Sequence, residues 1–260
     1  MSEELPPGGV AITEAEAAAP RSPARAPAEV TRPGAGLQAP RGGAGGWAAR
    51  APKNPRGAAD RTARAAPARG GRGAGPPAGP PGRLAGLSAP WCVAGGWALD
   101  VFRGGRSREH GDLEICVPAG RFPEVAACFP GHDFDVVASG LLWTGLSPEL
   151  LALTHQTWLR DRATGEYLVD VFREPHDGPT WICRRDPSVR LPYTAVVERS
   201  PEGIPYLAPE LVLLFKAKGD RPKDRRDFTT TLPLLDGGRR ARLAGLLGRV
   251  HPGHPWLAEL

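Results

Sequence analysis

Two acidic residues stand two positions apart in an apolar segment of the chain. Asp112 and Glu114 alternate with Leu113 and Ile115 in the stretch DLEICV. Because side chains two apart in a strand share a face, this pattern predicts a strand at 112–117 with both carboxylates on one side. Two carboxylates on one face repel each other, and a divalent cation relieves that repulsion. Magnesium suits such a site, because it prefers one or two carboxylates together with phosphate oxygens and water.

A third acid, Asp170, lies between apolar residues in YLVDVF. An acid in such a place costs free energy unless it is paired or bound to a metal. Carboxylates at 112, 114 and 170 on two neighbouring strands would hold two metal ions, as in-line phosphoryl displacement requires. A D-x-E pair alone is more often a solvated strand edge, so the acids by themselves leave both interpretations open.

Gly95 and Gly96 follow the apolar run WCVA and precede a short helical pattern that ends at Gly104 and Gly105. A glycine turn that opens a helix presents free backbone amides and the positive end of the helix dipole, which suits an anion such as a triphosphate. A pair of glycines is also typical of a simple tight turn. The glycine turn and the acids therefore point to a nucleotide site only when they are considered together.

Several cationic side chains are candidates for contact with phosphate. Arg108 could bind phosphate or form a surface ion pair, whereas a structural role is favoured for His110. Lys216, Lys218 and Lys223 belong to the expected helical C-terminal part, where a lysine could reach a triphosphate or remain a surface charge. Of these three we select Lys216, with Arg108, as the nucleotide-binding candidates.

Four further features receive structural interpretations. Glu210 and Asp227 are expected to pair with the lysines, and the two histidines of HPGHP, His251 and His254, lack a third metal ligand nearby. The tryptophans at 143, 158, 181 and 256 are expected in the core, although Trp143, in the loop-like LLWTGLS, could line an acceptor pocket.

The elements that would position these residues form an α+β (mixed α/β) unit. Strands are expected around 91–94, 112–117 and 134–139, and a hairpin over 157–172, with a helix in RFPEVAACF. After Pro192 the strands are expected to end. Helices are then predicted in PELVLLFKAK, in RPKDRRDFTTTLPLL and over 239–249. The expected organisation is a sheet-based part at 89–192 followed by a helical part at 193–260.

The first 88 residues differ in composition and are expected to be a disordered low-complexity tail. Residues 1–90 contain 16 Gly and 15 Pro, a single aromatic, Trp47, and 12 basic against 6 acidic residues. The remaining 170 residues carry 21 basic and 22 acidic groups, so the folded part has no basic excess that favours a nucleic-acid partner. An inert extension is favoured for the tail over an arm in weak contact with nucleic acid.

No signal peptide or membrane segment is recognised, and the four cysteines lack metal or disulfide spacing. A cytoplasmic location with reduced thiols is therefore expected. The oligomeric state is not indicated.

The combined motifs resemble a known family. GGWALDVFRGG followed by SREHGDLEICV resembles the polymerase-beta-like nucleotidyltransferases, and more narrowly the aminoglycoside and lincosamide nucleotidyltransferase branch. The likeness continues through WICRRDPSVRLP, GIPYLAPELVLLFKAK, RPKDRRDF and VHPGHPWLAEL, so that it covers about residues 91–260.

The resemblance implies a nucleotidyltransferase fold and transfer of a nucleoside monophosphate, AMP from ATP, to a hydroxyl of a small molecule such as an aminoglycoside. It implies Gly95 and Gly96 at the phosphates, Asp112 and Glu114 as magnesium ligands, and Asp170 as third ligand and general base. Many relatives have Asp where Glu114 stands, which moves the carboxylate by about 1 Å against a tolerance of roughly 0.5 Å. Modification of a protein or tRNA, and a non-catalytic binding module, are the alternatives.

Overall fold

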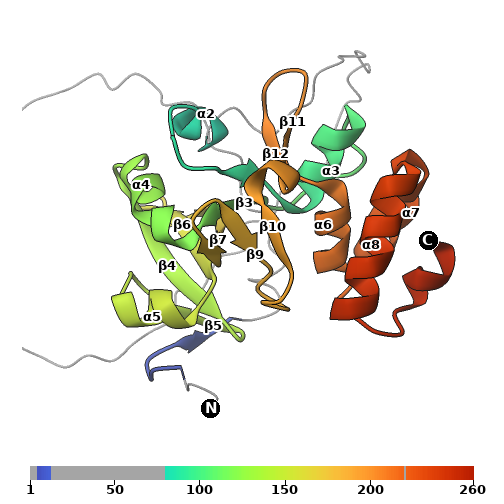
Figure 1. The fold of residues 1–260 in the computed structure, drawn as a ribbon. Helices are drawn as coiled ribbons and strands as arrows, with labels where there is room; N and C mark the ends of the chain where they lie inside the picture. Colours follow the sequence, from blue (N-terminus) through green and yellow to red (C-terminus); the bar gives the residue numbers. More distant parts are fainter. Residues whose placement is uncertain (1–4, 13–79, 220) are drawn as a thin grey trace, which may run out of the picture. The chain divides into compact units, whose positions relative to one another are not determined.

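The computed structural model describes residues 5–12, 80–219 and 221–260, all of them within one compact unit (Figure 1). Within these residues the longer strands are β3 (Leu113–Pro118), β4 (His132–Ala138), β6 (Gln156–Asp161) and β7 (Tyr167–Glu174). The shorter ones are β1 (Val10–Ala11), β2 (Cys92–Val93), β5 (Leu141–Trp143), β8 (His176–Asp177), β9 (Thr180–Ile182), β10 (Arg190–Pro192), β11 (Val197–Arg199) and β12 (Pro205–Leu207). The helices are α2 (Pro80–Leu84), α3 (Gly95–Arg103), α4 (Phe122–Ala127), α5 (Pro148–Leu153), α6 (Pro209–Lys216), α7 (Pro222–Thr231) and α8 (Gly237–Val250).

A mixed sheet carries most of the described strands, in the order β1-β5-β4-β6-β7-β3-β2-β12-β11. The pairs β3–β7 and β2–β12 are parallel and the others antiparallel, and β8, β9 and β10 form a separate small sheet. This arrangement confirms the α+β class. The expected hairpin is also present as β6 and β7, whose register pairs Trp158 with Asp170.

The expectation that strands end at Pro192 is wrong. The chain forms β11 and β12 after that residue, and β12 joins the sheet by pairing Tyr206 with Val93 of β2. These two strands have three residues each, and β12 begins with Pro205, a residue that normally argues against a strand within a sheet. Pro205 is tolerated because it stands at the first position of its strand.

Most of the expected tail, residues 13–79, lies outside the described residues. Two short stretches of it are described and have regular structure: residues 5–12 contain β1, and residues 80–88 contain α2. β1 pairs antiparallel with β5, matching Val10 with Leu142. Hence the tail expected over 1–88 contributes at least one strand to the sheet.

The main hydrophobic core lies between the sheet and the helices. Figure 1 shows α6, α7 and α8 gathered beside α3, and α6 packs on both α3 and α8. The expected core tryptophans at 143, 158, 181 and 256 are all buried. All four cysteines are free thiols. Among the described residues no helix is long and apolar enough to span a bilayer.

Candidate active site

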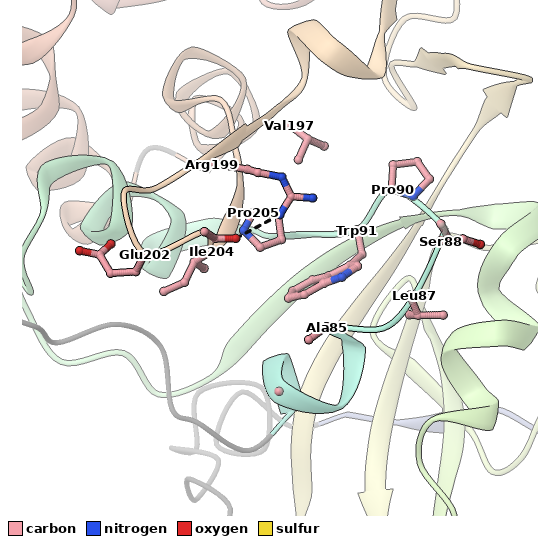
Figure 2. Close-up of a pocket in the computed structure, with 13 residues that line it drawn as sticks. Ala85, Leu87, Ser88, Pro90, Trp91, Val197, Arg199, Glu202, Ile204 and Pro205 are labelled. Atoms are coloured by element: carbon pink, nitrogen blue, oxygen red, sulfur yellow. Dashed lines mark hydrogen bonds between the residues drawn. The ribbon is translucent and has the colours of Figure 1, made fainter.

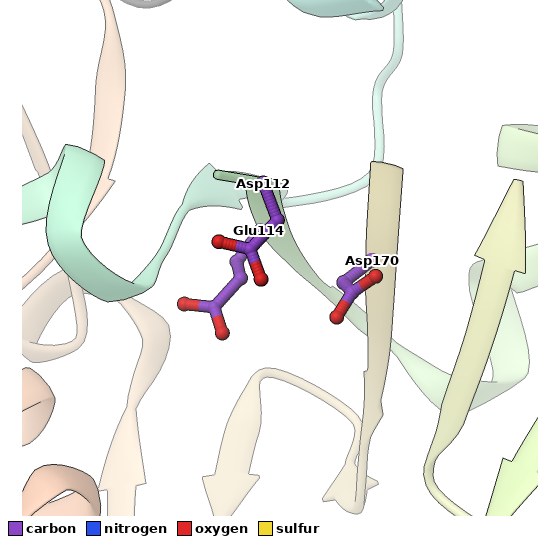
Figure 3. A group of neighbouring side chains, drawn as sticks. All are labelled: Asp112, Glu114 and Asp170. Carbon is purple, nitrogen blue, oxygen red and sulfur yellow. The ribbon is translucent and has the colours of Figure 1, made fainter. Parts of the chain in front are cut away.

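The three acidic residues singled out in the sequence converge on one place. Asp112 immediately precedes β3, Glu114 lies on β3, and Asp170 lies on the adjacent strand β7, directly opposite Glu114 in the parallel register. Each offers a carboxylate oxygen, and the three oxygens lie within 4.8 Å of one another. Figure 3 shows the three carboxylates facing a common space. An all-oxygen donor set at this spacing fits a hard divalent cation.

The glycine turn at the start of α3 makes room for the longer Glu114 side chain. A Cβ at position 95 would overlap the Glu114 carboxylate, and Gly95 has a positive φ of 58°. A side chain at 95 would therefore be strained and would also displace an acid of the cluster. The helix that begins here has no side-chain N-cap, because Ala94 stands at that position, so its first amides receive no cap from that residue.

Glu114 is held in an environment that disfavours its charge. Burial and the neighbouring Asp112 carboxylate both raise the pKa of Glu114, while the positive charges of Lys216 and Lys223 only partly offset them. Repulsion between the two acids is what a bound cation would remove. The raised pKa thus reflects the same crowding of carboxylates that a bound cation would relieve.

Asp170 is fixed by its strand and by a residue that the sequence did not single out. Asp170 is only 4% exposed. Its Oδ2 accepts a hydrogen bond from Gln156 Nε2 at 3.0 Å. Gln156 lies at the start of β6, the strand next to β7. The sequence did not mark Gln156, because it stands one residue before the stretch expected to form the first strand of the hairpin.

Among the described residues, four cations line the cavity that contains the carboxylates. This cavity has a volume of about 370 Å³, and its lining includes Arg108, Lys216, Arg221 and Lys223 together with Gly96 and His110. The structure therefore brings Gly96, Arg108 and Lys216 to the same cavity as the three acids. Gly95 contributes to an adjoining cavity of about 230 Å³ that also includes Glu114 and Lys216. Arg221 and Lys223 come from the motif RPKDRRDF, and Lys218 is exposed outside this lining.

Two buried carboxylates of α7 hold three of these cations in place. Asp227 accepts two hydrogen bonds from Arg108, at 3.1 and 3.0 Å, and pairs with Lys216 Nζ at 2.9 Å. Asp224 pairs with Lys216 at 3.2 Å and with Arg221 at 2.6 Å. The expected pairing of Asp227 with a lysine is thus present. The cationic side of the cavity is positioned by α7.

His110 has the structural role that was favoured for it, and it also lines the cavity. Its Nε2 lies 2.5 Å from Asp100 Oδ2, and its ring packs against Trp97. Burial alone would raise the pKa of Asp100, but hydrogen bonds from His110, Ser107 and Arg103 outweigh it and hold that pKa well below its usual range. The ring of His110 occupies the space where a Cβ at Gly96 would stand.

Replacing Asp227 with asparagine is expected to destabilise the fold by about 3 kcal/mol at neutral pH, because it leaves Arg108 and Lys216 without their shared buried partner. Burial raises the pKa of Asp227, but Arg108 and Lys216 outweigh it and lower that pKa on folding. The stability that Asp227 contributes is therefore complete above the unfolded pKa of about 4 and is lost as the pH falls through the folded pKa. Urea unfolding at pH 7 and pH 3 measures the difference.

Asp177→Asn is the matched control for this substitution. Asp177 pairs with Arg190 at 3.4 Å, but its side chain is 76% exposed, so the change should cost less than about 1 kcal/mol at either pH. If Asp227→Asn cost no more than Asp177→Asn, or if its effect did not shrink in acid, the assigned role of Asp227 would be wrong.

Other expected candidates do not join the site. Glu210 pairs with Arg239 and Arg242 of α8 rather than with a lysine, because α6 packs on α8. Trp143 is buried on β5 and is not part of the lining; Trp158 on β6 lines the cavity instead.

The two C-terminal histidines have protein partners, as a structural interpretation requires. His251 Nε2 lies 3.2 Å from Arg185 Nη1, and His254 Nε2 lies 3.0 Å from the Ala217 carbonyl oxygen.

A larger hollow of about 640 Å³ lies apart from the carboxylates, between the segment after α2 and the β11–β12 hairpin. Figure 2 shows Trp91 lying between this segment and the hairpin residues Arg199, Ile204 and Pro205. Its described lining has one acid, Glu202, and no cluster of titratable groups. The chemistry-bearing residues are therefore those of the smaller cavity.

A comparison with known protein families matches the part of the chain that contains the glycine turn and two of the three acids. The model of the family described as Aminoglycoside-2''-adenylyltransferase matches residues 82–140, which include the glycine turn and the first two acids. The resemblance stated from the sequence is thereby confirmed for this part of the chain. None of the curated proteins matches this chain in sequence.

Solved structures similar to this chain include the lincosamide antibiotic adenylyltransferase LnuA with lincomycin bound, at 19% identity over 56% of this chain and 87% of that one, with a TM-score of 0.40. ANT(2")-Ia in complex with adenylyl-2"-tobramycin is 15% identical over 65% of this chain and 92% of that one, with a TM-score of 0.44. An antigenic nucleotidyltransferase-like protein from Paracoccidioides brasiliensis is 17% identical over 65% and 84%, with a TM-score of 0.36.

Proposed function

We propose that this chain is a magnesium-dependent nucleotidyltransferase that moves a nucleoside monophosphate, AMP from ATP, onto a hydroxyl of an antibiotic-like small molecule. The observation that carries the proposal is the convergence of Asp112, Glu114 and Asp170 beside the glycine turn of α3. The match of residues 82–140 to an adenylyltransferase family supports the same reaction. Neither a protein nor a tRNA acceptor is favoured by a specific feature of the described residues.

The nucleotide would lie with its phosphates between the amino end of α3 and the cations of the cavity. Gly95 and Gly96 leave the backbone open to an anion, and Arg108 and Lys216 supply positive charge that α7 keeps in place. Asp112, Glu114 and Asp170 would hold the metal. When bound, magnesium neutralises phosphate charge and favours attack at phosphorus.

The transfer itself needs a base, and Asp170 is the residue we assign to it. Its carboxylate would accept the proton of the acceptor hydroxyl as the oxygen forms its bond to the α-phosphorus. The bond from that phosphorus to the bridging oxygen breaks, and pyrophosphate leaves. Gln156 would keep Asp170 oriented through its hydrogen bond to Oδ2.

Calorimetric titration of the protein with ATP tests the proposal most directly. Binding is expected in the presence of magnesium and should weaken at least about tenfold when EDTA replaces the metal, because the three acids repel an unaccompanied triphosphate. Binding of equal strength in EDTA, or no binding in magnesium, would contradict the proposal. Pyrophosphate release in a screen of hydroxyl-bearing antibiotics then separates an enzyme from a non-catalytic binding module, which would bind ATP but release none.

A further inference from the structure

We infer that the N-terminal segment, residues 5–12, forms a wall of the acceptor side of the active-site cavity and helps to select the acceptor. The wall fits a hydroxyl compound with an apolar face and few positive charges. This inference rests on the proposed function, because it assigns a substrate class to the same site. It also makes part of the stretch 1–88, expected to be dispensable, a component of that site.

The N-terminal segment is attached to the sheet by backbone hydrogen bonds. Within it, β1 pairs with β5, and the amide of Ile12 donates to the Gly140 carbonyl oxygen at 2.7 Å. At its other end, the Pro6 carbonyl oxygen accepts a hydrogen bond from Trp143 Nε1 at 3.3 Å. Leu5 packs against the small hydrophobic cluster that contains Trp143. The segment is thus anchored at both ends.

The sequence of the N-terminal segment suits this attachment closely. A Cβ at Gly9 would lie 2.6 Å from two ring carbons of Trp143 and 3.0 Å from Leu141 Cβ. No real Cβ approaches ring carbons so closely, so only glycine allows the segment to lie on the indole without displacing it. From the sequence, Trp143 could line an acceptor pocket. It does not line the cavity, but it supports the N-terminal segment that does.

Ile12 lines the same cavity as Asp170. The sheet order runs β1-β5-β4-β6-β7-β3, and the lining residues Val137, Trp158 and Asp170 come from β4, β6 and β7 in turn. The glycine turn begins α3, which packs on β3 and β12, and Lys216 and Lys223 lie on α6 and α7, the helices that pack against α3. An acceptor whose hydroxyl reaches Asp170 must therefore extend toward Ile12.

The charges of the lining indicate the chemical class of this acceptor. Among the described lining residues the carboxylates are those at 112, 114 and 170, which belong to the metal cluster. The remaining lining on the acceptor side consists of Ile12, Val137 and Trp158 with the amide of Gln156 and the backbone of Gly140. A compound with many ammonium groups finds no separate carboxylate in that lining, whereas an apolar face can pack on it.

The test uses the full chain and compares Ile12→Trp with Leu234→Trp, a matched change at a residue that is 52% exposed. Lincomycin, which has a single amine and an alkyl side chain, and tobramycin, which has several amines, serve as acceptor probes, with pyrophosphate release as the readout. Ile12→Trp is expected to raise the KM for lincomycin about tenfold or more, since a filled pocket rejects its ligand. The KM for ATP should change by less than about twofold, and Leu234→Trp should change neither.

A second variant, Gly9→Leu, should act in the same way by pushing the N-terminal segment away from Trp143. An unchanged KM for lincomycin in both variants, or a parallel rise in the KM for ATP, would overturn the inference. A higher kcat/KM for tobramycin than for lincomycin, or turnover of other hydroxyl-bearing antibiotics but of neither probe, would overturn the assigned class. Failure of the proposed function would be recognised separately, because the wild-type protein would then either not bind ATP in magnesium or bind it and release no pyrophosphate with any antibiotic of the screen.

Discussion

Asp170→Asn is expected to lower kcat for nucleotidyl transfer by about 10²- to 10⁴-fold, the range typical of losing a general base. A carboxamide cannot accept the proton of the acceptor hydroxyl. The substitution keeps the size of the side chain, and the amide of Gln156 can still donate to the oxygen that replaces Oδ2. β7 is held between β3 and β6, so the backbone at 170 should not move.

Binding of ATP in magnesium should survive this change within about tenfold, because Asp112, Glu114 and the cations that face the phosphates are intact. Pyrophosphate release under saturating ATP measures kcat, and calorimetry measures the affinity for ATP. Asp177→Asn, on an exposed position, is the control and should leave both unchanged. An unaltered kcat in Asp170→Asn would remove this residue from the mechanism. Complete loss of ATP binding would instead make it chiefly a residue of the nucleotide site.

The parts of the site that could be predicted from the sequence are those encoded locally. The alternation around Asp112 and Glu114 predicted a strand with both acids on one face, and the helix after the glycine turn ends at Arg103, with Gly104 as its C-cap, as its pattern indicated. Even Asp170 could be placed, because the hairpin that carries it has a local turn signal. These inferences needed only the periods of strands and helices.

The parts that could not be predicted depend on pairings between distant segments. β1 has only two residues and lies in a glycine- and proline-rich stretch. It forms a strand because it pairs with β5, which stands more than a hundred residues further along the chain. Gln156 stands just before the expected hairpin at 157–172, and it reaches Asp170 because β6 begins one residue earlier than its pattern predicted. The sequence offered several lysines and acids, but only the packing of α7 decided that Asp227 binds Arg108 and Lys216.

Glu114→Gln is expected to abolish measurable transfer while it stabilises the protein in the absence of metal. Glutamine cannot supply the negative oxygen that a magnesium ion prefers, so the affinity for ATP in magnesium should fall. In the metal-free protein, however, burial and Asp112 raise the pKa of Glu114, which means that its ionised form is disfavoured by folding. Removing that charge relieves the repulsion. The gain should be about 1 kcal/mol, as for other substitutions that relieve a functional site.

The pH dependence of this stabilisation follows from the direction of the shift. Because the folded protein holds the proton of Glu114 more tightly than the unfolded chain does, stability falls as the pH rises from the unfolded pKa of about 4 through the raised folded pKa. The advantage of the glutamine variant should therefore be absent below about pH 4 and complete above the folded pKa. Glu166→Gln, at an exposed position, should show no such trend.

Magnesium should reverse the order of stability between the two proteins. A ligand that binds only the folded state raises its stability, so thermal melting of the wild type should shift upward in magnesium and ATP more than that of Glu114→Gln. Melting curves at pH 8 in EDTA and in magnesium with ATP measure both effects, and a difference of about 1 kcal/mol corresponds to roughly 2–4 °C in Tm at this size. If the variant were less stable than the wild type in EDTA, burial of Glu114 would not carry the electrostatic cost assigned to it. Both effects have one origin. The two carboxylates at 112 and 114 repel each other in the metal-free protein, and the same two negative charges attract a cation when it is present.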